Sequence, residues 1–214
     1  MLLEELREIV WKCNLELRKY GLVVMTSGNI SGRDPETGLV VIKPSGYSYE
    51  EMTPADMVVV DMDGKIIEGH LKPSVDTETH LYVYAHRPDV WGIGHTHSPY
   101  ASSFAALGKP IPPCLTASAM LGGEIPLGKY VPIGGAAVGA EIVAVIGNAR
   151  AIIMQNHGVF TIGNSPQQAA KMAVEVEEIA KITHLALLLG RPTILTPEQL
   201  GETGDLYKNT YGQR

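Results

Sequence analysis

The sequence is poor in cysteine and has neither a block of basic residues nor a long uninterrupted apolar run. Its 214 residues include two cysteines, Cys13 and Cys114, whose positions lack metal-ligand spacing. A chain of this length buries a sizeable core without disulfides, so we expect both side chains to be buried thiols. Glycine, proline or charge interrupts every apolar stretch well before the length of a membrane span. The sequence therefore predicts no membrane-spanning segment.

Positive charge is also scarce. The 17 lysines and arginines are outnumbered by 23 acidic residues, which gives a net charge of −6, and the basic residues form no cluster. Such a chain lacks the broad basic face that binds nucleic acid, so any phosphate that it binds should be small. Near the N-terminus, Glu4, Glu5 and Glu8 interrupt the apolar residues, which is unlike a cleavable secretory signal. We expect a cytoplasmic protein with a small-molecule substrate and neither a nucleic-acid nor a membrane partner.

The residues that are present are typical of a globular protein, with 45% hydrophobic and 19% charged side chains. The length predicts a single domain over residues 1–214, without repeats or linkers. The first third of the chain combines one amphipathic helix with short β-rich runs that are separated by glycine and proline. The helix is expected at 4–20, the strands at 22–25, 39–42, 57–60 and 65–67, and a hairpin turn at 61–64.

Helices and strands alternate in the rest of the chain. Ser98 followed by Pro99 is typical of a helix start, and residues 165–168 have the pattern of a capping box before a long amphipathic helix. Helices are expected at 77–86, after Ser98, at 135–146 and after 165, and strands at 90–94, 151–154 and 159–162. Meander strands with interspersed helices predict an α/β sandwich whose sheet is mainly antiparallel, because the βαβ repetition of a doubly wound fold is missing.

Three of the seven histidines are candidate metal ligands. His95 and His97 are two residues apart at the end of an apolar strand, so both imidazoles should point to the same side. His157 follows another apolar strand in a similar setting. Solvated loop histidines and, for His157, ordinary hairpin-turn chemistry are the alternatives. Three neutral imidazoles with an open fourth position form a catalytic zinc site, which is the interpretation we favour. The other histidines are expected to have packing or surface roles.

Three short loops, 28–31, 43–46 and 72–76, combine polar side chains with glycine or lysine. Each alone is consistent with an ordinary turn. Together they predict an anion cradle, because backbone N–H groups, Ser and Asn side chains and a nearby cation are what a phosphate monoester requires. Asp76 ends the third loop and opens a helix, so it is either a helix N-cap or a general base near the metal.

These motifs, in this order and spacing, resemble those of the class II sugar aldolases, the family of L-fuculose-1-phosphate aldolase and L-ribulose-5-phosphate 4-epimerase. The matching segments are Gly28-Asn29-Ile30-Ser31, Lys43-Pro44-Ser45-Gly46, Lys72-Pro73-Ser74, His95-Thr96-His97 and Asn156-His157-Gly158. The resemblance covers nearly the whole chain and implies a single-domain α/β/α sandwich around a largely antiparallel central sheet. It also implies a homotetramer with active sites at subunit interfaces, in which His95, His97 and His157 bind one Zn²⁺ per subunit.

The resemblance assigns roles to the remaining site residues. Asp76 matches the acid/base carboxylate of the family. Tyr211 matches a catalytic tyrosine that reaches the active site of a neighbouring subunit. The positions that match phosphate-binding residues are Asn29, Ser45, Gly46 and Ser74. Val75 departs from the family, in which a phosphate-binding serine is common at this position.

The aldolases and epimerases of this family share a first step, in which cleavage between C3 and C4 of a ketose phosphate leaves a metal-bound enediolate. Asp76 and Tyr211 resemble the epimerase branch. Segment 114–123 resembles neither branch, because it lacks the second aspartate of the epimerases and the tyrosine of the aldolases. Cleavage requires the metal and one acid/base group, so we predict a zinc-dependent aldolase for a substrate like L-fuculose 1-phosphate. The alternatives are a 4-epimerase, a sugar-acid phosphate decarboxylase and a non-catalytic binding module.

Overall fold

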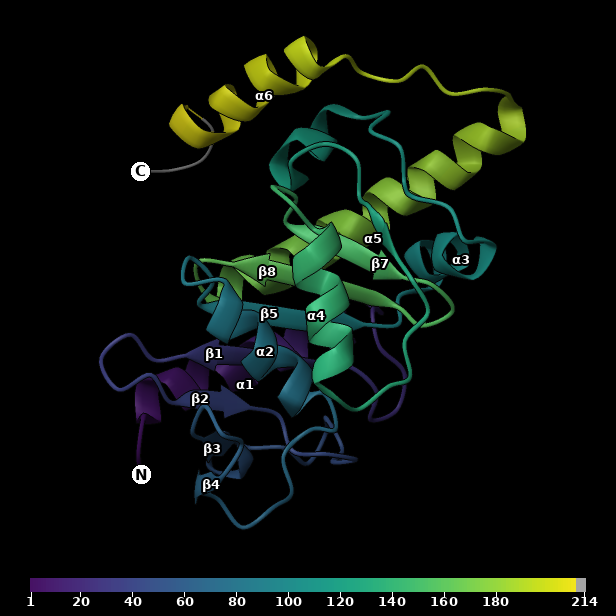
Figure 1. The fold of residues 1–214 in the computed structure, drawn as a ribbon. Helices are drawn as coiled ribbons and strands as arrows, with labels where there is room; N and C mark the ends of the chain where they lie inside the picture. Colours follow the sequence, from purple (N-terminus) through teal and green to yellow (C-terminus); the bar gives the residue numbers. More distant parts are fainter. Residues whose placement is uncertain (211–214) are drawn as a thin grey trace.

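One eight-stranded sheet forms the centre of the molecule in the computed structural model, which describes residues 1–210 (Figure 1). The strands are β1 (Asn29–Arg33), β2 (Val40–Ile42), β3 (Val58–Val60), β4 (Ile66–Glu68), β5 (Gly92–Thr96), β6 (Leu127–Gly128), β7 (Ala151–Met154) and β8 (Val159–Gly163). Their spatial order is β4-β3-β2-β1-β5-β8-β7-β6, and all pairings are antiparallel except β6 with β7. The predicted, mainly antiparallel sheet is confirmed.

Helices cover both faces of this sheet, so the α/β/α sandwich is also confirmed. They are α1 (Glu4–Lys19), α2 (Thr77–His86), α3 (Pro99–Leu107), α4 (Ala136–Val145), α5 (Pro166–Leu189) and α6 (Pro197–Asn209), with short 3₁₀ helices η1 (Pro54–Asp56) and η2 (Thr116–Leu121). Helices α2 and α4 pack together over one face, and α1 packs with α5 over the other (Figure 1). No helix within residues 1–210 has both the length and the apolar character needed to cross a bilayer.

The two-sided burial of the sheet explains the apolar runs in its strands. Along β3, Val58 and Val60 enter the core beneath α2 and α4, whereas Val59 enters the core beneath α1. Successive side chains of a strand point to opposite faces, so a strand covered on both faces needs apolar residues at consecutive positions. The cysteines fit this core only in part: Cys13 is buried, whereas Cys114 is half-buried with its Sγ 3.0 Å from Thr183 Oγ1.

The expected strand at 22–25 is wrong, and residues 29–31, which the sequence predicts to lie in a loop, belong to strand β1. Leu22 and Val23 are buried, but they pack into the core as part of a connection. The chain then turns at Gly28, where φ is +76°, and enters β1. Asn, Ser and Gly have low strand propensity, yet β1 pairs with β2 on one side and β5 on the other. Pairing on both sides has overridden local propensity.

Helix α6 forms the C-terminal part of the described chain, and Tyr207 lies within it. Thr196 and Gln199 form a reciprocal capping box at the start of this helix, and Pro197 occupies its first turn. Tyr211 lies outside the described residues.

Candidate functional site

The central strands bring the candidate ligands together from two distant parts of the chain. His95 lies within β5, which ends at Thr96, two residues beyond the expected strand end. Its register partners are Asn29 on β1 and Phe160 on β8. His97 follows β5 directly. His157 lies in the turn between β7 and β8, so it is a hairpin residue and a neighbour of the other two histidines at once.

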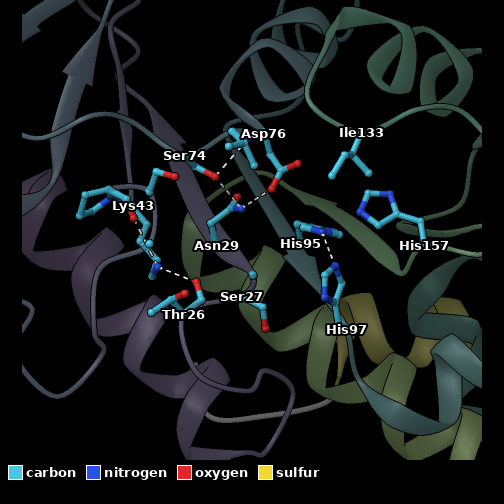
Figure 2. Close-up of a pocket in the computed structure, with 15 residues that line it drawn as sticks. Thr26, Ser27, Asn29, Lys43, Ser74, Asp76, His95, His97, Ile133 and His157 are labelled. Carbon is cyan, nitrogen blue, oxygen red and sulfur yellow. Dashed lines mark hydrogen bonds between the residues drawn. The ribbon is translucent and has the colours of Figure 1, made fainter.

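The three imidazoles converge on one point (Figure 2). Their ring centroids are 4.8 Å apart for His95 and His97, 4.8 Å for His95 and His157, and 5.5 Å for His97 and His157. One ring nitrogen from each lies within 4.8 Å of the others, and the Nε2 atoms of His95 and His97 are 3.0 Å apart. Nitrogen atoms at such separations can share one cation.

The environment of the rings keeps them neutral and orients them. Burial lowers the pKa of His95 to about 3, and burial also lowers the pKa values of His97 and His157. The Nδ1 of His95 lies 2.9 Å from the carbonyl oxygen of Val159, to which it donates when Nε2 carries the lone pair. Metal ligation needs the neutral form with a free lone pair, so the donor set fits a divalent metal ion.

Asp76 lies beside this cluster and does not cap its helix. It occupies the N-cap position of α2, but its side chain makes no capping hydrogen bond. Instead, its Oδ2 accepts a 2.8 Å hydrogen bond from Asn29 Nδ2. Burial by itself raises the pKa of Asp76, but His95, His80 and the bond from Asn29 together outweigh it and hold the pKa below its usual value. Asp76 is therefore an ionised carboxylate with an oxygen free to accept a proton.

The loops of the expected anion cradle are fastened to one another. Ser74 N donates to Lys43 O at 3.0 Å, and Ser45 N donates to Lys72 O at 2.9 Å. Asn29 Nδ2 also donates to Ser74 Oγ at 3.0 Å, which ties β1 to the same loop. These bonds hold the hydroxyl and amide groups of the loops in one place.

One cavity of about 300 Å³ joins the imidazoles, Asp76 and the loops (Figure 2). All eight predicted site residues within 1–210 line it: Asn29, Ser45, Gly46, Ser74, Asp76, His95, His97 and His157. Asp76 is the one carboxylate among the described residues that line the cavity. The residues of η2, in the segment that lacks the expected second acid, do not contribute to it.

Thr26, Ser27 and Ile133 also line the cavity, although the sequence does not predict them as site residues. Lys43 lines it too; the sequence predicts it as part of a cradle loop but assigns it no individual role. Lys43 is 1% exposed, and its Nζ donates to Thr26 O at 3.0 Å and lies 4.7 Å from the ring centroid of Tyr49. Among the residues the structure describes, no carboxylate pairs with it. Burial lowers its pKa to about 8. A lysine directly after the apolar strand β2 was the signal available in the sequence.

Glycine is required where the backbone passes the histidines. A Cβ at Gly158 would lie 2.5 Å from Thr96 O and 2.8 Å from His97 Cδ2. A Cβ at Gly28 would lie 2.9 Å from His95 O, and its positive φ further disfavours other residues. The glycines thus allow the two turns to approach β5 closely.

The chain belongs to the class II aldolase and adducin N-terminal domain family, whose model matches residues 8–184. A solved structure of an L-fuculose 1-phosphate aldolase is 30% identical, with a TM-score of 0.91 and coverage of 95% of this chain and 96% of that one. The L-fuculose 1-phosphate aldolase of Glaciozyma antarctica is 24% identical, with a TM-score of 0.82 and coverage of 94% and 81%. That of Thermus thermophilus is 24% identical, with a TM-score of 0.72 and coverage of 88% and 98%. The last two similarities concern the fold alone.

Proposed function

We propose that this protein is a zinc-dependent aldolase that cleaves a ketose phosphate, similar to L-fuculose 1-phosphate, between C3 and C4. The observation that carries the proposal is a single cavity in which three neutral imidazoles lie beside a carboxylate that its helix does not use as a cap. Membership of the class II aldolase family and the similarity to an L-fuculose 1-phosphate aldolase support the same reaction.

In this proposal His95, His97 and His157 hold the metal ion, which supplies Lewis-acid stabilisation of negative charge on the substrate oxygens. Asp76 accepts the proton of the C4 hydroxyl group. The electron pair of the C3–C4 bond then passes to the ketose fragment, which becomes an enediolate, and the other fragment leaves as an aldehyde. Protonation of the enediolate at C3 completes the balance. Asn29 holds the carboxylate of Asp76 toward the substrate through its 2.8 Å bond.

We propose that the phosphate group binds in the loops that hydrogen bonds join to one another, through Asn29, Ser45, Gly46 and Ser74. Support comes from the bonds that pre-organise these groups, since a rigid cradle loses less entropy on binding. Lys43 adds a buried cation that lacks a carboxylate partner within residues 1–210. A phosphate would supply the missing negative charge.

A 4-epimerase is the second candidate, because Asp76 and Tyr211 both resemble that branch. Epimerisation requires the aldehyde to be rejoined on its other face, which calls for a second acid/base group. The single carboxylate among the described residues of the cavity favours the lyase.

Incubation of the purified protein with L-fuculose 1-phosphate and L-ribulose 5-phosphate tests the proposal. An aldolase releases a triose phosphate or glycolaldehyde phosphate, whereas an epimerase yields an isomeric ketose phosphate without fragments. About one zinc per subunit should be measured, and His95→Ala should lose both metal and turnover. His70→Ala is the matched control, because this imidazole is 72% exposed and lies outside the cavity. Active protein without a divalent metal would refute the zinc assignment.

A further inference from the structure

Two buried contacts connect β1 to the start of α2 beside the cavity. In the first, Asn29 donates to Asp76 at 2.8 Å; in the second, Ser31 Oγ lies 2.7 Å from His80 Nδ1. Asn29 and Ser31 share a face of β1 because they are two residues apart, and Asp76 and His80 share a face of α2 because they are four apart. The two contacts are therefore neighbouring rungs between the same strand and helix.

In the second contact, the hydrogen bonds have a defined donor and acceptor at each step. The hydroxyl groups of Tyr84 and Ser31 are 2.8 Å apart, and Ser31 Oγ is the acceptor that the described residues offer to the Tyr84 proton. The proton of Ser31 is then directed to Nδ1 of His80. Full burial lowers the pKa of His80 to about 4, so the ring is neutral and carries one proton. With Nδ1 as acceptor, that proton resides on Nε2.

Two polar atoms in these rungs have no hydrogen-bond partner within residues 1–210. They are Nε2 of His80 and Oδ1 of Asn29, in side chains that are 0% and 2% exposed. One is a donor and the other an acceptor, so the two are complementary. Leaving either atom unpaired is unfavourable, which is why buried polar groups are nearly always hydrogen-bonded.

We propose that His80 is a positioning residue of the site, whose Nε2–H donates to Asn29 Oδ1 through one bridging water molecule. All donors then run in one direction, from Tyr84 through Ser31, His80 and Asn29 to the Asp76 carboxylate. This bond adds to the two that Asn29 Nδ2 donates to Ser74 and Asp76, and it anchors the other end of the amide. Without it, Oδ1 has no partner among the described residues that holds it away from the Asp76 carboxylate. The inference rests on the proposed role of Asp76 as the acid/base group.

A pair of substitutions separates the distal donor of His80 from its packing. In His80→Asn the shorter amide retains a group near Nδ1 for Ser31 but has none near Nε2. In His80→Gln the longer amide provides a donor near Nε2. Loss of an outer-shell partner typically costs about 10–100-fold, so we expect that reduction in kcat for His80→Asn. The KM for the ketose phosphate and the metal content should be unchanged, and His80→Gln should recover kcat to within about threefold. Equal kcat values for the two variants would overturn the proposal.

A double-mutant cycle tests whether His80 acts through Asp76. In an Asp76→Asn background, the additional change His80→Asn should reduce the residual kcat no further, because the group that it positions is already absent. A second loss as large as that of the single variant would place the effect of His80 in the general integrity of the fold and not in the chain of donors.

The tautomer of His80 provides a readout that is independent of turnover. In the metal-loaded protein, ¹⁵N NMR should show His80 protonated at Nε2, and Ser31→Ala should shift its population toward the other tautomer. Protonation at Nδ1 in the unsubstituted protein would contradict the proposal. If none of the ketose phosphates is turned over, the proposed function fails, while the tautomer measurement still decides the direction of the chain.

Discussion

Asp76 illustrates how the use of one side chain decides between a structural and a chemical role. Aspartate is a common helix N-cap, and Asp76 occupies that position at the start of α2. Its carboxylate nevertheless accepts a bond from Asn29 on the neighbouring strand, and it lines the cavity together with the three histidines. A carboxylate that accepts capping hydrogen bonds would be less available for proton transfer. The absence of a capping bond therefore favours the chemical role of Asp76.

Asp76→Asn should therefore leave the fold and metal content intact and lower kcat by about 10²–10⁴-fold, the range for a positioned acid/base group. Asparagine is nearly isosteric but cannot accept the proton. Steady-state kinetics and metal analysis provide the measurement, and Glu78→Gln, an exposed carboxylate on the same helix, is the control. Full activity in Asp76→Asn would return this residue to a purely structural role.

Lys43 should make stability depend on pH in a predictable direction. Its pKa is lowered by burial to about 8 from 10.5, so between these values the unfolded chain binds a proton that the folded chain does not. Stability should then rise with pH across this window, and below about pH 8 the full cost of the buried charge persists. Lys43→Met removes that cost but also the bond to Thr26.

We expect Lys43→Met to be more stable than the unsubstituted protein at pH 7 by roughly 1–2 kcal/mol, with a smaller difference at pH 10. Urea denaturation at the two pH values measures this. The variant should also show a raised KM for a phosphorylated substrate, because the proposed cradle loses its buried cation. A less stable variant at pH 7 would show that the bonds of the ammonium group outweigh its desolvation.

At the scale of single elements, the sequence around Ser98 predicts the correct start of helix α3 but the wrong capping group. Ser98 is the N-cap residue as predicted, but its side chain makes no capping bond and its Oγ is buried without a partner within residues 1–210. The carboxylate of Glu177 on α5 instead accepts bonds from the backbone of Tyr100 and Ala101, both at 2.9 Å. A carboxylate at a helix N-terminus also interacts favourably with the helix dipole.

Glu177→Ala should consequently destabilise the protein by about 1–2 kcal/mol, whereas Ser98→Ala should change stability by less than about 0.5 kcal/mol. Thermal or chemical denaturation of the two variants gives the comparison. A larger loss for Ser98→Ala would mean that the serine is the true cap of α3.

Elements with a strong local pattern could be predicted from the sequence, and elements that depend on neighbours could not. The period of apolar residues in α1 and α5 and the proline-containing starts of α3 and α5 are local, so their positions were predicted closely. Strand β1 is polar and rich in glycine, and only β2 and β5 on either side make it a strand. Histidine spacing predicted the grouping of His95 and His97. The unpaired polar atoms around His80 lie where α2 packs against β1, so the sequence did not predict them.

At the scale of the whole molecule, the last turns of α5 expose a row of apolar side chains, with Leu185 at 46%, Leu188 at 72% and Leu189 at 92%. A large exposed apolar patch commonly marks an interaction surface. We therefore propose, with the family resemblance, a ring of four subunits whose mass in light scattering should be about four times the 23.0 kDa of one chain.

The proposed role of Tyr211 can be tested by mixing subunits. If Tyr211 acts in a neighbouring subunit, as the resemblance implies, Tyr211→Phe should lower kcat by about 10²-fold and leave metal content and assembly unchanged. His95→Ala subunits lack the metal ligand but carry the tyrosine, and Tyr211→Phe subunits have the reverse defect. In an equal mixture that forms random rings, about a quarter of the sites combine an intact His95 with an intact neighbouring Tyr211, so activity should recover to about that fraction. Mixed rings, verified by mass, that show no recovery would exclude a site shared across the interface.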